Sequence, residues 1–202
     1  MKTFVKVIIL CIFIVGILFY KTKNDELITH NLNKETKEEN KEEIVDEFEL
    51  YLNKAINIMK EEKEKTLNSS KYLEVFNTKN MSWCTEFVVW SLLEADKQLN
   101  TNYVNNIYPL LDTGAKASNW FKKNNRLHLE KDYIPKRGDF MFFKYYEKIV
   151  DHTAFVIDVK EIDGITYVYT IEGNIPSLKD KSIKERILPI DDKYIYGYGS
   201  FN

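Results

Sequence analysis

The pattern of hydrophobic and polar positions changes several times along the chain. An unbroken apolar run extends from Val7 to Tyr20, and a strongly acidic stretch covers residues 25–49. Farther on, apolar residues recur at steps of three and four, which is the spacing of one helix face. After Pro135, apolar and aromatic segments have the length and alternation of β-strands. Helices followed by strands predict an α+β fold rather than an alternating α/β fold.

Three segments have the helical pattern. The first carries an apolar stripe from residue 44 to residue 59 and ends at the turn-forming residues 68–70. Such a stripe predicts a coiled-coil or packing helix rather than a binding surface. The second helix is expected from Cys84 to about Ala95, and a short third one from Ala115 to Asn124. The apolar stripe of the first segment consists of Ile44, Phe48, Leu52, Ala55 and Met59.

Four segments in the last third of the chain have the strand pattern. Their sequences are DFMFFK, HTAFVIDV, ITYVYTIEG and YIYGYGSF. The pair Asp163-Gly164 separates the second segment from the third and is a strong hairpin signal. The order of elements therefore predicts that these two strands are antiparallel neighbours.

The first 23 residues predict membrane targeting. The apolar run has 14 residues, which suits a signal-peptide core because a full span needs about 20. No small-x-small cleavage pattern follows, however, and the stretch lengthens to residues 4–20 if Lys6 snorkels. A cleaved signal and an uncleaved membrane anchor both remain open. Either one predicts an extracytoplasmic location, anchored to the cell membrane or secreted.

Composition divides the chain into three parts. Residues 1–23 are the signal peptide or anchor, and residues 24–67 are an acidic spacer that continues into the amphipathic helix. Residues 25–49 contain ten acidic residues and three lysines, a composition that cannot bury enough surface to fold alone. Residues 68–202 are expected to form the folded domain. The sequence sets no oligomeric state.

Charge and cysteine content exclude several classes of function. The chain has 29 Lys and Arg against 31 Asp and Glu, so it lacks the basic footprint of a nucleic-acid-binding protein. Its two cysteines, Cys11 and Cys84, cannot make a disulfide framework. No metal-ligand spacing of His and Cys is present, and no cofactor is predicted. Cys84 is thus the one cysteine outside the apolar run.

Cys84 has two interpretations. It shares a helix face with Phe87, Val88 and Leu92, which favours a small hydrophobic residue in a core. It also lies in the first turn of a helix that Ser82 is expected to cap. There, the positive end of the helix dipole favours a thiolate, and free backbone N–H groups can hold an oxyanion. The spacing alone leaves both interpretations open.

A nucleophilic cysteine needs a base, and the folded part offers His128 and His152. His128 lies in a polar connection and is expected to be an ordinary surface residue. His152 begins a strand, and Glu172 and Asn174 lie at the end of the strand across the hairpin. An ideal two-residue turn puts Glu172 and His152 on opposite faces, whereas a longer turn or a bulge puts them on one face. The sequence does not choose between these registers.

Together these segments resemble the CHAP domain, the cysteine- and histidine-dependent amidohydrolase/peptidase related to the NlpC-type hydrolases. The similar stretches are WCTEFVVW, IPKRGDFMFF, DHTAFVIDV and IEGN, and the resemblance covers about residues 71–202. It implies a papain-like α+β fold in which N-terminal helices, including the cysteine helix, pack on an antiparallel sheet. It also implies cleavage of amide bonds in bacterial peptidoglycan, in stem or cross-bridge peptides.

The resemblance also assigns roles to residues of this chain. Cys84 would be the nucleophile, His152 the general base and Glu172 the residue that orients His152, with Asn174 as a fourth polar member. Apart from the resemblance, Trp83 and Trp120 are candidates to line a groove for the substrate, and core or rim packing is the other interpretation of both. Trp83 replaces a glutamine of some members, and Asp151 stands where glycine is frequent. Some members bind calcium near the cysteine, but the chain lacks a clustered Asp/Asn loop of that kind.

Two other functions remain open at this point. One is a non-catalytic cell-envelope protein that uses the same fold to bind the wall or a partner. The other is a cysteine protease or transpeptidase that acts on proteins. The complete set of Cys84, His152, Glu172 and Asn174 argues against a degenerate, inactive copy.

Overall fold

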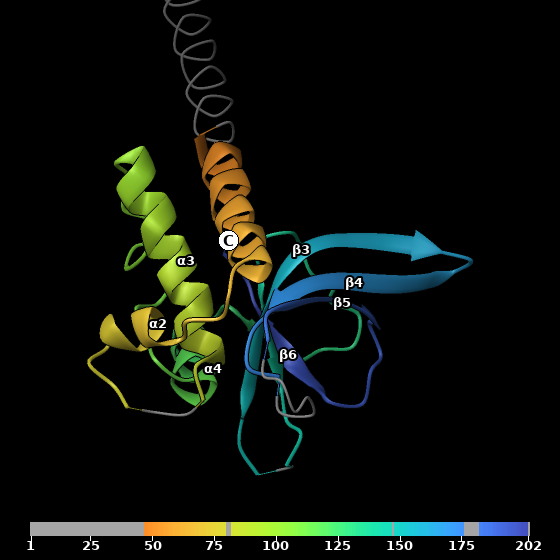
Figure 1. Ribbon diagram of the computed structural model, residues 1–202. Helices are drawn as coiled ribbons and strands as arrows, with labels where there is room; N and C mark the ends of the chain where they lie inside the picture. The colour runs from red at the N-terminus through yellow and green to blue at the C-terminus, as the bar shows by residue number, and fades with distance from the viewer. Residues whose placement is uncertain (1–46, 80–81, 147, 176–181, 202) are drawn as a thin grey trace, which may run out of the picture. The chain divides into compact units, whose positions relative to one another are not determined.

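The computed structural model describes residues 47–79, 82–146, 148–175 and 182–201 (Figure 1). The predicted targeting segment and most of the acidic spacer lie outside these residues and stay predictions. Within the described ranges, no helix is long and apolar enough to cross a membrane. Residues 50–202 form one compact unit, to which the description below refers.

Six strands form a single antiparallel sheet in the order β1-β6-β2-β3-β4-β5. The α+β class is therefore confirmed, and four of the strands coincide with the four predicted segments. The short β1 and the edge strand β5 were not predicted. The strands are β1 Leu127–His128, β2 Phe140–Phe143, β3 His152–Ile162, β4 Ile165–Glu172, β5 Lys184–Pro189 and β6 Ile195–Gly199.

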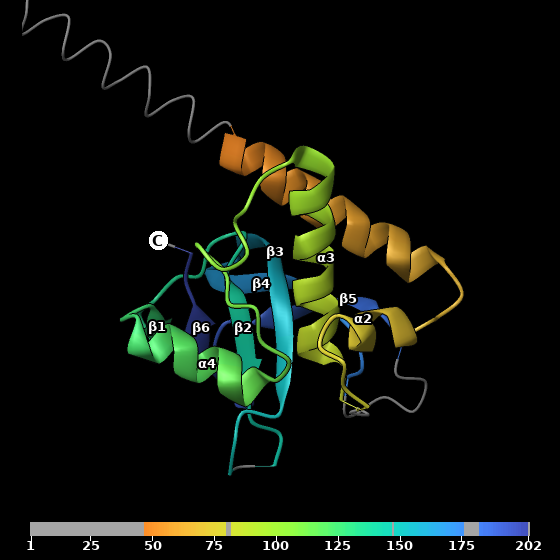
Figure 2. The same ribbon diagram turned by 90° about the vertical axis from the view of Figure 1, so that its left-hand side faces the viewer.

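Helices cover one face of this sheet (Figure 2). Beyond the described part of the first helix, residues 47–64, they are α2 Ser70–Glu74, α3 Cys84–Leu99 and α4 Gly114–Lys123. On the covered face, the aromatic rings of Phe140, Phe142 and Phe155 pack against Tyr108, in the connection between α3 and α4, and against Phe121 of α4. These ring contacts hold α4 and the connection before it on the sheet.

The described part of the apolar stripe on the first helix is a packing surface, as predicted, while Ile44 lies outside the described residues. Leu52, Ala55 and Met59 are fully buried. The Tyr51 hydroxyl donates to the Leu92 carbonyl at 3.1 Å, which ties this helix to α3. Its stability therefore comes from tertiary contacts with the folded unit.

Helix α3 begins at Cys84, as predicted, but differs from the prediction in its C-terminal end and in its N-cap. It runs to Leu99, one turn beyond Ala95, and ends where Asn100 adopts a left-handed conformation with φ of 55°. Asn is one of the few residues that tolerate this C-terminal conformation. At the other end the N-cap is Trp83 rather than Ser82, and no side chain caps the helix. The first-turn N–H groups are thus not used by a capping side chain.

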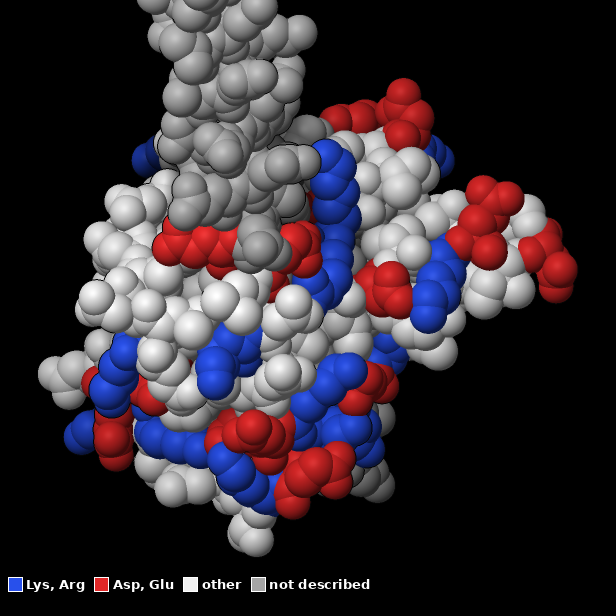
Figure 3. Space-filling view, turned by 90° about the horizontal axis from the view of Figure 1, so that it is seen from above, with Lys and Arg blue, Asp and Glu red and all other residues white. Residues whose placement is uncertain are grey.

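The second face of the sheet carries its own hydrophobic cluster. It contains Met141, Phe143, Ala154, Val156, Val168, Leu188 and Tyr198. Elsewhere on the surface, basic and acidic side chains are interspersed, as the view in Figure 3 shows.

Candidate active site

Cys84 is the first residue of α3 and keeps 3% of its surface exposed. The helix that carries it is anchored by its buried face, which includes Phe87, Val88 and Leu92. The helix is therefore a core element whose first turn reaches the sheet, and a nucleophilic role of Cys84 is compatible with this packing. At this position the partial positive charge of the helix N-terminus acts on the sulfur.

His152 is the first residue of β3 and has no exposed surface. It pairs with Phe143 of β2, and the two rings lie 5.5 Å apart, on the face of the second hydrophobic cluster. The next residue, Thr153, points to the other face, where its hydroxyl lies 2.9 Å from that of Thr85 in α3. This contact holds the first turn of α3 against the start of β3.

The register of the hairpin decides whether Glu172 meets His152. The turn is the two-residue type, with Ile162 paired to Ile165 and both Asp163 and Gly164 at positive φ. A bulge between Val156 and Asp158 then shifts the pairing by one residue. Of the two registers that the sequence left open, the observed one is therefore the register that puts Glu172 and His152 on the same face of the sheet.

In this register Glu172 lies diagonal to His152 on the same face of the sheet. The His152 Nε2 and Glu172 Oε2 atoms are 2.6 Å apart, and both side chains are fully buried. The other carboxylate oxygen, Oε1, accepts a hydrogen bond from the Thr170 hydroxyl at 2.9 Å. Because Glu172 accepts from Nε2, the second ring nitrogen, Nδ1, is left to act toward Cys84.

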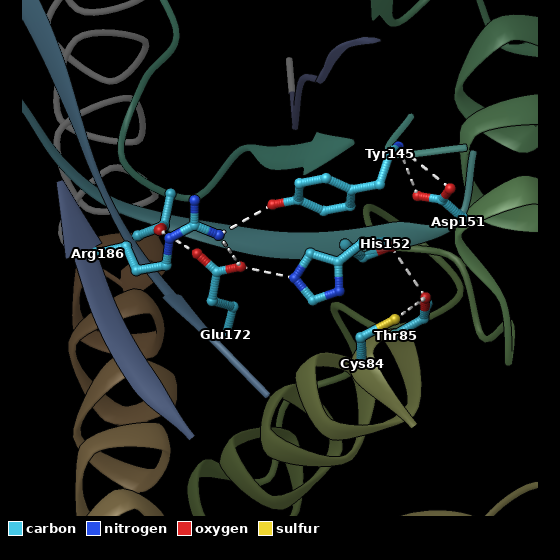
Figure 4. Close-up of polar contacts among 9 residues, drawn as sticks. Cys84, Thr85, Tyr145, Asp151, His152, Glu172 and Arg186 are labelled. Carbon is cyan, nitrogen blue, oxygen red and sulfur yellow. Dashed lines mark hydrogen bonds and ion pairs between the residues drawn. The ribbon is translucent and has the colours of Figure 1, made fainter. Parts of the chain in front are cut away.

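The edge of the His152 imidazole faces the Cys84 sulfur (Figure 4). The Nδ1 atom is buried and has no hydrogen-bond partner of good geometry among the described residues. Charge attraction first, and hydrogen bonding second, couple the titration of the two side chains.

The coupling moves both pKa values toward a thiolate–imidazolium pair. Burial alone would raise the pKa of Cys84, but the charge of His152, the Thr153 backbone and the Thr85 hydroxyl lower it below the usual thiol value. Burial alone would lower the pKa of His152, but the charges of Cys84 and Glu172 raise it to about 9. Between these two pKa values the sulfur is anionic and the imidazole carries a proton.

Two residues that the sequence did not indicate complete the surroundings of Glu172. Arg186 of β5 donates from Nη1 to Glu172 Oε2 at 3.2 Å and to the Tyr145 hydroxyl at 3.0 Å. Tyr145 follows β2, and its ring centroid lies 6.0 Å from that of His152. Asp151, where the family frequently has glycine, accepts the backbone N–H groups of Tyr145 and Tyr146 (Figure 4).

The remaining predicted site residues lie in different surroundings. Asn174 is two residues beyond Glu172, is 6% exposed and has a φ of 56°. Trp83 is 4% exposed, and its ring packs against Tyr72, Phe87 and the backbone of Gly173. Trp120 is half-buried on α4, next to Phe121. The roles of these three in catalysis or substrate binding stay predictions.

His128 lies in β1 and belongs to a different group of residues. Its ring stacks on Tyr133 with centroids 3.8 Å apart, and its nitrogens contact Glu130 and Ser200. Across the described ranges, no group of three or more His, Cys, Asp or Glu side chains is arranged to hold a metal ion.

These observations define a class of protein, an α+β domain in which a helix N-terminal cysteine faces a histidine that a buried glutamate holds. Comparison with known families agrees with this description. Residues 76–174 match the family model of the CHAP domain, which is the family that the resemblance predicted. This family is typically hydrolytic and acts on peptidoglycan-related substrates. All three residues of the buried group lie within the matched range.

Two further comparisons add no functional assignment. The sequence has no significant match among curated proteins. One solved structure, described as the crystal structure of Ly7917, shares 10% identity and a TM-score of 0.35 with this chain. The alignment covers 65% of this chain and 62% of the other. A likeness at this level supports no conclusion about the site.

Proposed function

We propose that this protein cleaves amide bonds in peptidoglycan stem or cross-bridge peptides, using Cys84 as the nucleophile. The observation that carries the proposal is the continuous arrangement of Cys84, His152 and the buried Glu172 within the residues that match the CHAP domain. A papain-like arrangement of helix and sheet is part of the proposal, as is an extracytoplasmic location.

The thiolate–imidazolium pair provides the first chemical step. The Cys84 thiolate attacks the carbonyl carbon of the scissile amide and forms a tetrahedral intermediate. The backbone N–H groups in the first turn of α3, which no capping side chain uses, are placed to stabilise the oxyanion. The protonated Nδ1 of His152 then donates its proton to the leaving amine, and a thioester on Cys84 remains.

The second step returns the enzyme to its starting state. His152 is now neutral, and its contact with Glu172 keeps the remaining proton on Nε2, so Nδ1 can accept a proton from water. The resulting hydroxide attacks the thioester, and the carboxylic acid product and the Cys84 thiolate are released. The water proton stays on Nδ1, which restores the imidazolium. Asn174 would add a further polar contact, as predicted.

Access to the sulfur is a condition of this mechanism. Cys84 keeps only 3% of its surface exposed, so covering side chains must move aside before a peptide carbonyl can reach Sγ. Chain-like substrates such as stem or cross-bridge peptides are narrow enough to enter a small opening. A folded protein would first have to present an extended segment.

The test is digestion of purified peptidoglycan by the full chain in detergent micelles, with Cys84→Ala as the matched control. New amino groups and peptide fragments, identified by mass spectrometry, are expected with the wild type and not with the variant. Equal release by both would contradict the thiol mechanism. Cleavage of an unfolded protein such as casein, without release from the wall, would favour the protease. Wall binding without any cleavage would favour the non-catalytic protein.

A further inference from the structure

Arg186 connects the buried acid of the site to an aromatic residue on a separate loop. Its Nη1 atom donates to Glu172 Oε2 at 3.2 Å and to the Tyr145 hydroxyl at 3.0 Å. The Oε2 atom is the same oxygen that contacts His152 Nε2 at 2.6 Å. Arg186 and His152 therefore share one carboxylate oxygen, and the position of this oxygen depends on both.

Tyr145 is itself held in place from two sides. Its ring stacks on Phe143 with centroids 5.4 Å apart and an interplanar angle of 7°. Its backbone N–H donates to the carboxylate of Asp151 at 3.1 Å. Since Asp151 immediately precedes His152, the loop that carries the tyrosine is fixed to the start of β3. A rigid hydroxyl thus accepts one of the hydrogen bonds of Arg186 (Figure 4).

The site needs a permanent positive charge at this place. Glu172 has no exposed surface, and a buried carboxylate is costly unless it is paired. In the proposed mechanism His152 loses its positive charge whenever it protonates the leaving amine. A guanidinium stays charged throughout, because its pKa lies far above any working pH. The Arg186 side chain, at 26% exposure, is close enough to Glu172 to provide that charge.

We propose that Arg186, oriented by Tyr145, is a positioning residue that keeps the Glu172 carboxylate aimed at His152 when the imidazole is neutral. This inference rests on the proposed function, because the neutral imidazole arises in the catalytic cycle. The residues that hold Arg186 in place are Tyr145 on one side and Glu172 on the other. Without the arginine, Oε2 of Glu172 keeps its contact with His152 but loses its contact with the guanidinium, so the carboxylate fixes the tautomer of His152 less firmly.

The charge of Arg186 also has a defined effect on titration. The groups that surround His152 and Glu172 come from several elements: Cys84 of α3, Tyr145 with Asp192 near it, and Arg186 and Lys184 of β5. Removing one positive charge makes thiolate formation at Cys84 less favourable and makes the imidazolium of His152 more favourable. Both pKa values of the pair therefore rise when Arg186 becomes neutral.

The experiment compares Arg186→Gln, Arg186→Lys and Tyr145→Phe with the wild type. The matched control is Arg137→Gln, because the Arg137 guanidinium donates to Asn53 on the first helix at 2.8 Å and is not part of the site. Two pH profiles are recorded for each protein, the rate of Cys84 alkylation by iodoacetamide and kcat/KM for release of wall fragments. Alkylation needs no wall substrate, so it tests Arg186 even if the proposed hydrolysis fails.

Arg186→Gln is expected to lower kcat/KM about 10- to 100-fold, as for loss of a charged hydrogen bond. The acidic and alkaline limbs of its hydrolysis profile, and its alkylation profile, should shift to higher pH by roughly one pH unit. Arg186→Lys should keep the wild-type limbs because the charge is retained, with a smaller loss of rate. Tyr145→Phe should lower the rate and shift the limbs slightly in the same direction. The control should match the wild type.

The proposal would be overturned if the limbs of the pH profile are unchanged in Arg186→Gln. Equal losses of kcat/KM in Arg186→Gln and Arg186→Lys would also overturn it, because a purely structural role predicts both results. If Arg186→Gln does not fold, Tyr145→Phe decides, since it removes only a hydroxyl and keeps the stacked ring. A Tyr145→Phe profile identical to that of the wild type would then overturn the proposal. Shifted alkylation limbs without any wall hydrolysis would support the electrostatic role and contradict only the proposed function.

Discussion

Gly173 links the two halves of the candidate site, and its substitution gives a quantitative prediction. It follows Glu172, and the ring of Trp83, the residue before Cys84, packs directly on its backbone. A Cβ at this position would lie 2.3 Å from Cζ3 of Trp83 and 2.9 Å from Cη2. Ordinary carbon contacts are about 3.5–4.0 Å, so the ring or the strand end must move by roughly 1 Å.

Trp83 has little room to move, because its ring is enclosed by Tyr72 and Phe87. Gly173→Ala is therefore expected to lower the free energy of unfolding by about 1–3 kcal/mol, which is the usual cost of overpacking. The shift also separates Cys84 from Glu172. Since a misplacement of about 1 Å can cost about 100-fold in rate, the rate of hydrolysis by the folded variant should fall by far more than its loss of stability explains.

The assays are urea unfolding and release of wall fragments, each measured in a double-mutant cycle with Trp83→Phe. The smaller ring leaves room for the new methyl group, so the double variant should lose less stability than the two single variants together. A coupling of at least about 0.5 kcal/mol is expected for residues in direct contact. Gly164→Ala is the control for coupling, because no atom lies within 4 Å of its added Cβ; its φ of 76° makes alanine strained there, but the loss should add to that of Trp83→Phe without coupling. Additive losses for Gly173 and Trp83 would refute the steric reasoning.

Two further predictions concern the same site. Thr85→Val or Thr153→Val alone should destabilise the fold by about 1–3 kcal/mol, because the remaining buried hydroxyl loses its partner at 2.9 Å. The double valine variant should recover most of this stability in urea unfolding. A double variant that loses as much stability as the two single variants added together would contradict this prediction. Hydrolysis should follow a bell-shaped pH profile. The rate should rise as the pH passes the lowered pKa of Cys84 and fall as the pH passes the pKa of His152, which is about 9. A fall in rate near pH 6.5 would contradict the thiolate–imidazolium pair.

The sequence was sufficient to predict the elements of the site but not their pairing. The α+β order, the cysteine helix and the strands that carry His152 and Glu172 are each visible as local patterns. The register is not, because it depends on a bulge at Ile157, an ordinary strand residue with no turn signal. That one extra residue decides which face Glu172 occupies.

Arg186 shows why part of the site could not be found from the sequence. It lies in the charged stretch KDKSIKER, where an arginine is expected to be solvated. Only the pairing of β5 with β4, which sets Arg186 opposite Thr170, brings its guanidinium to Glu172. The packing of Trp83 was one of two interpretations of the sequence, but its neighbours Gly173 and Tyr72 are distant in the chain and are visible only in the structure.

The central claim, that His152 activates Cys84, is tested most directly by the pH dependence of Cys84 alkylation in the wild type and in His152→Gln. Iodoacetamide modification is followed at Cys84 by peptide mass spectrometry, so that Cys11 does not interfere. We expect the wild-type thiol to react as a thiolate well below the usual pKa of about 8.5. In His152→Gln the profile should move up to 8.5 or above, because the raising effect of burial is then opposed only by the smaller effects of the Thr153 backbone and the Thr85 hydroxyl. Identical profiles in the two proteins would contradict the claim.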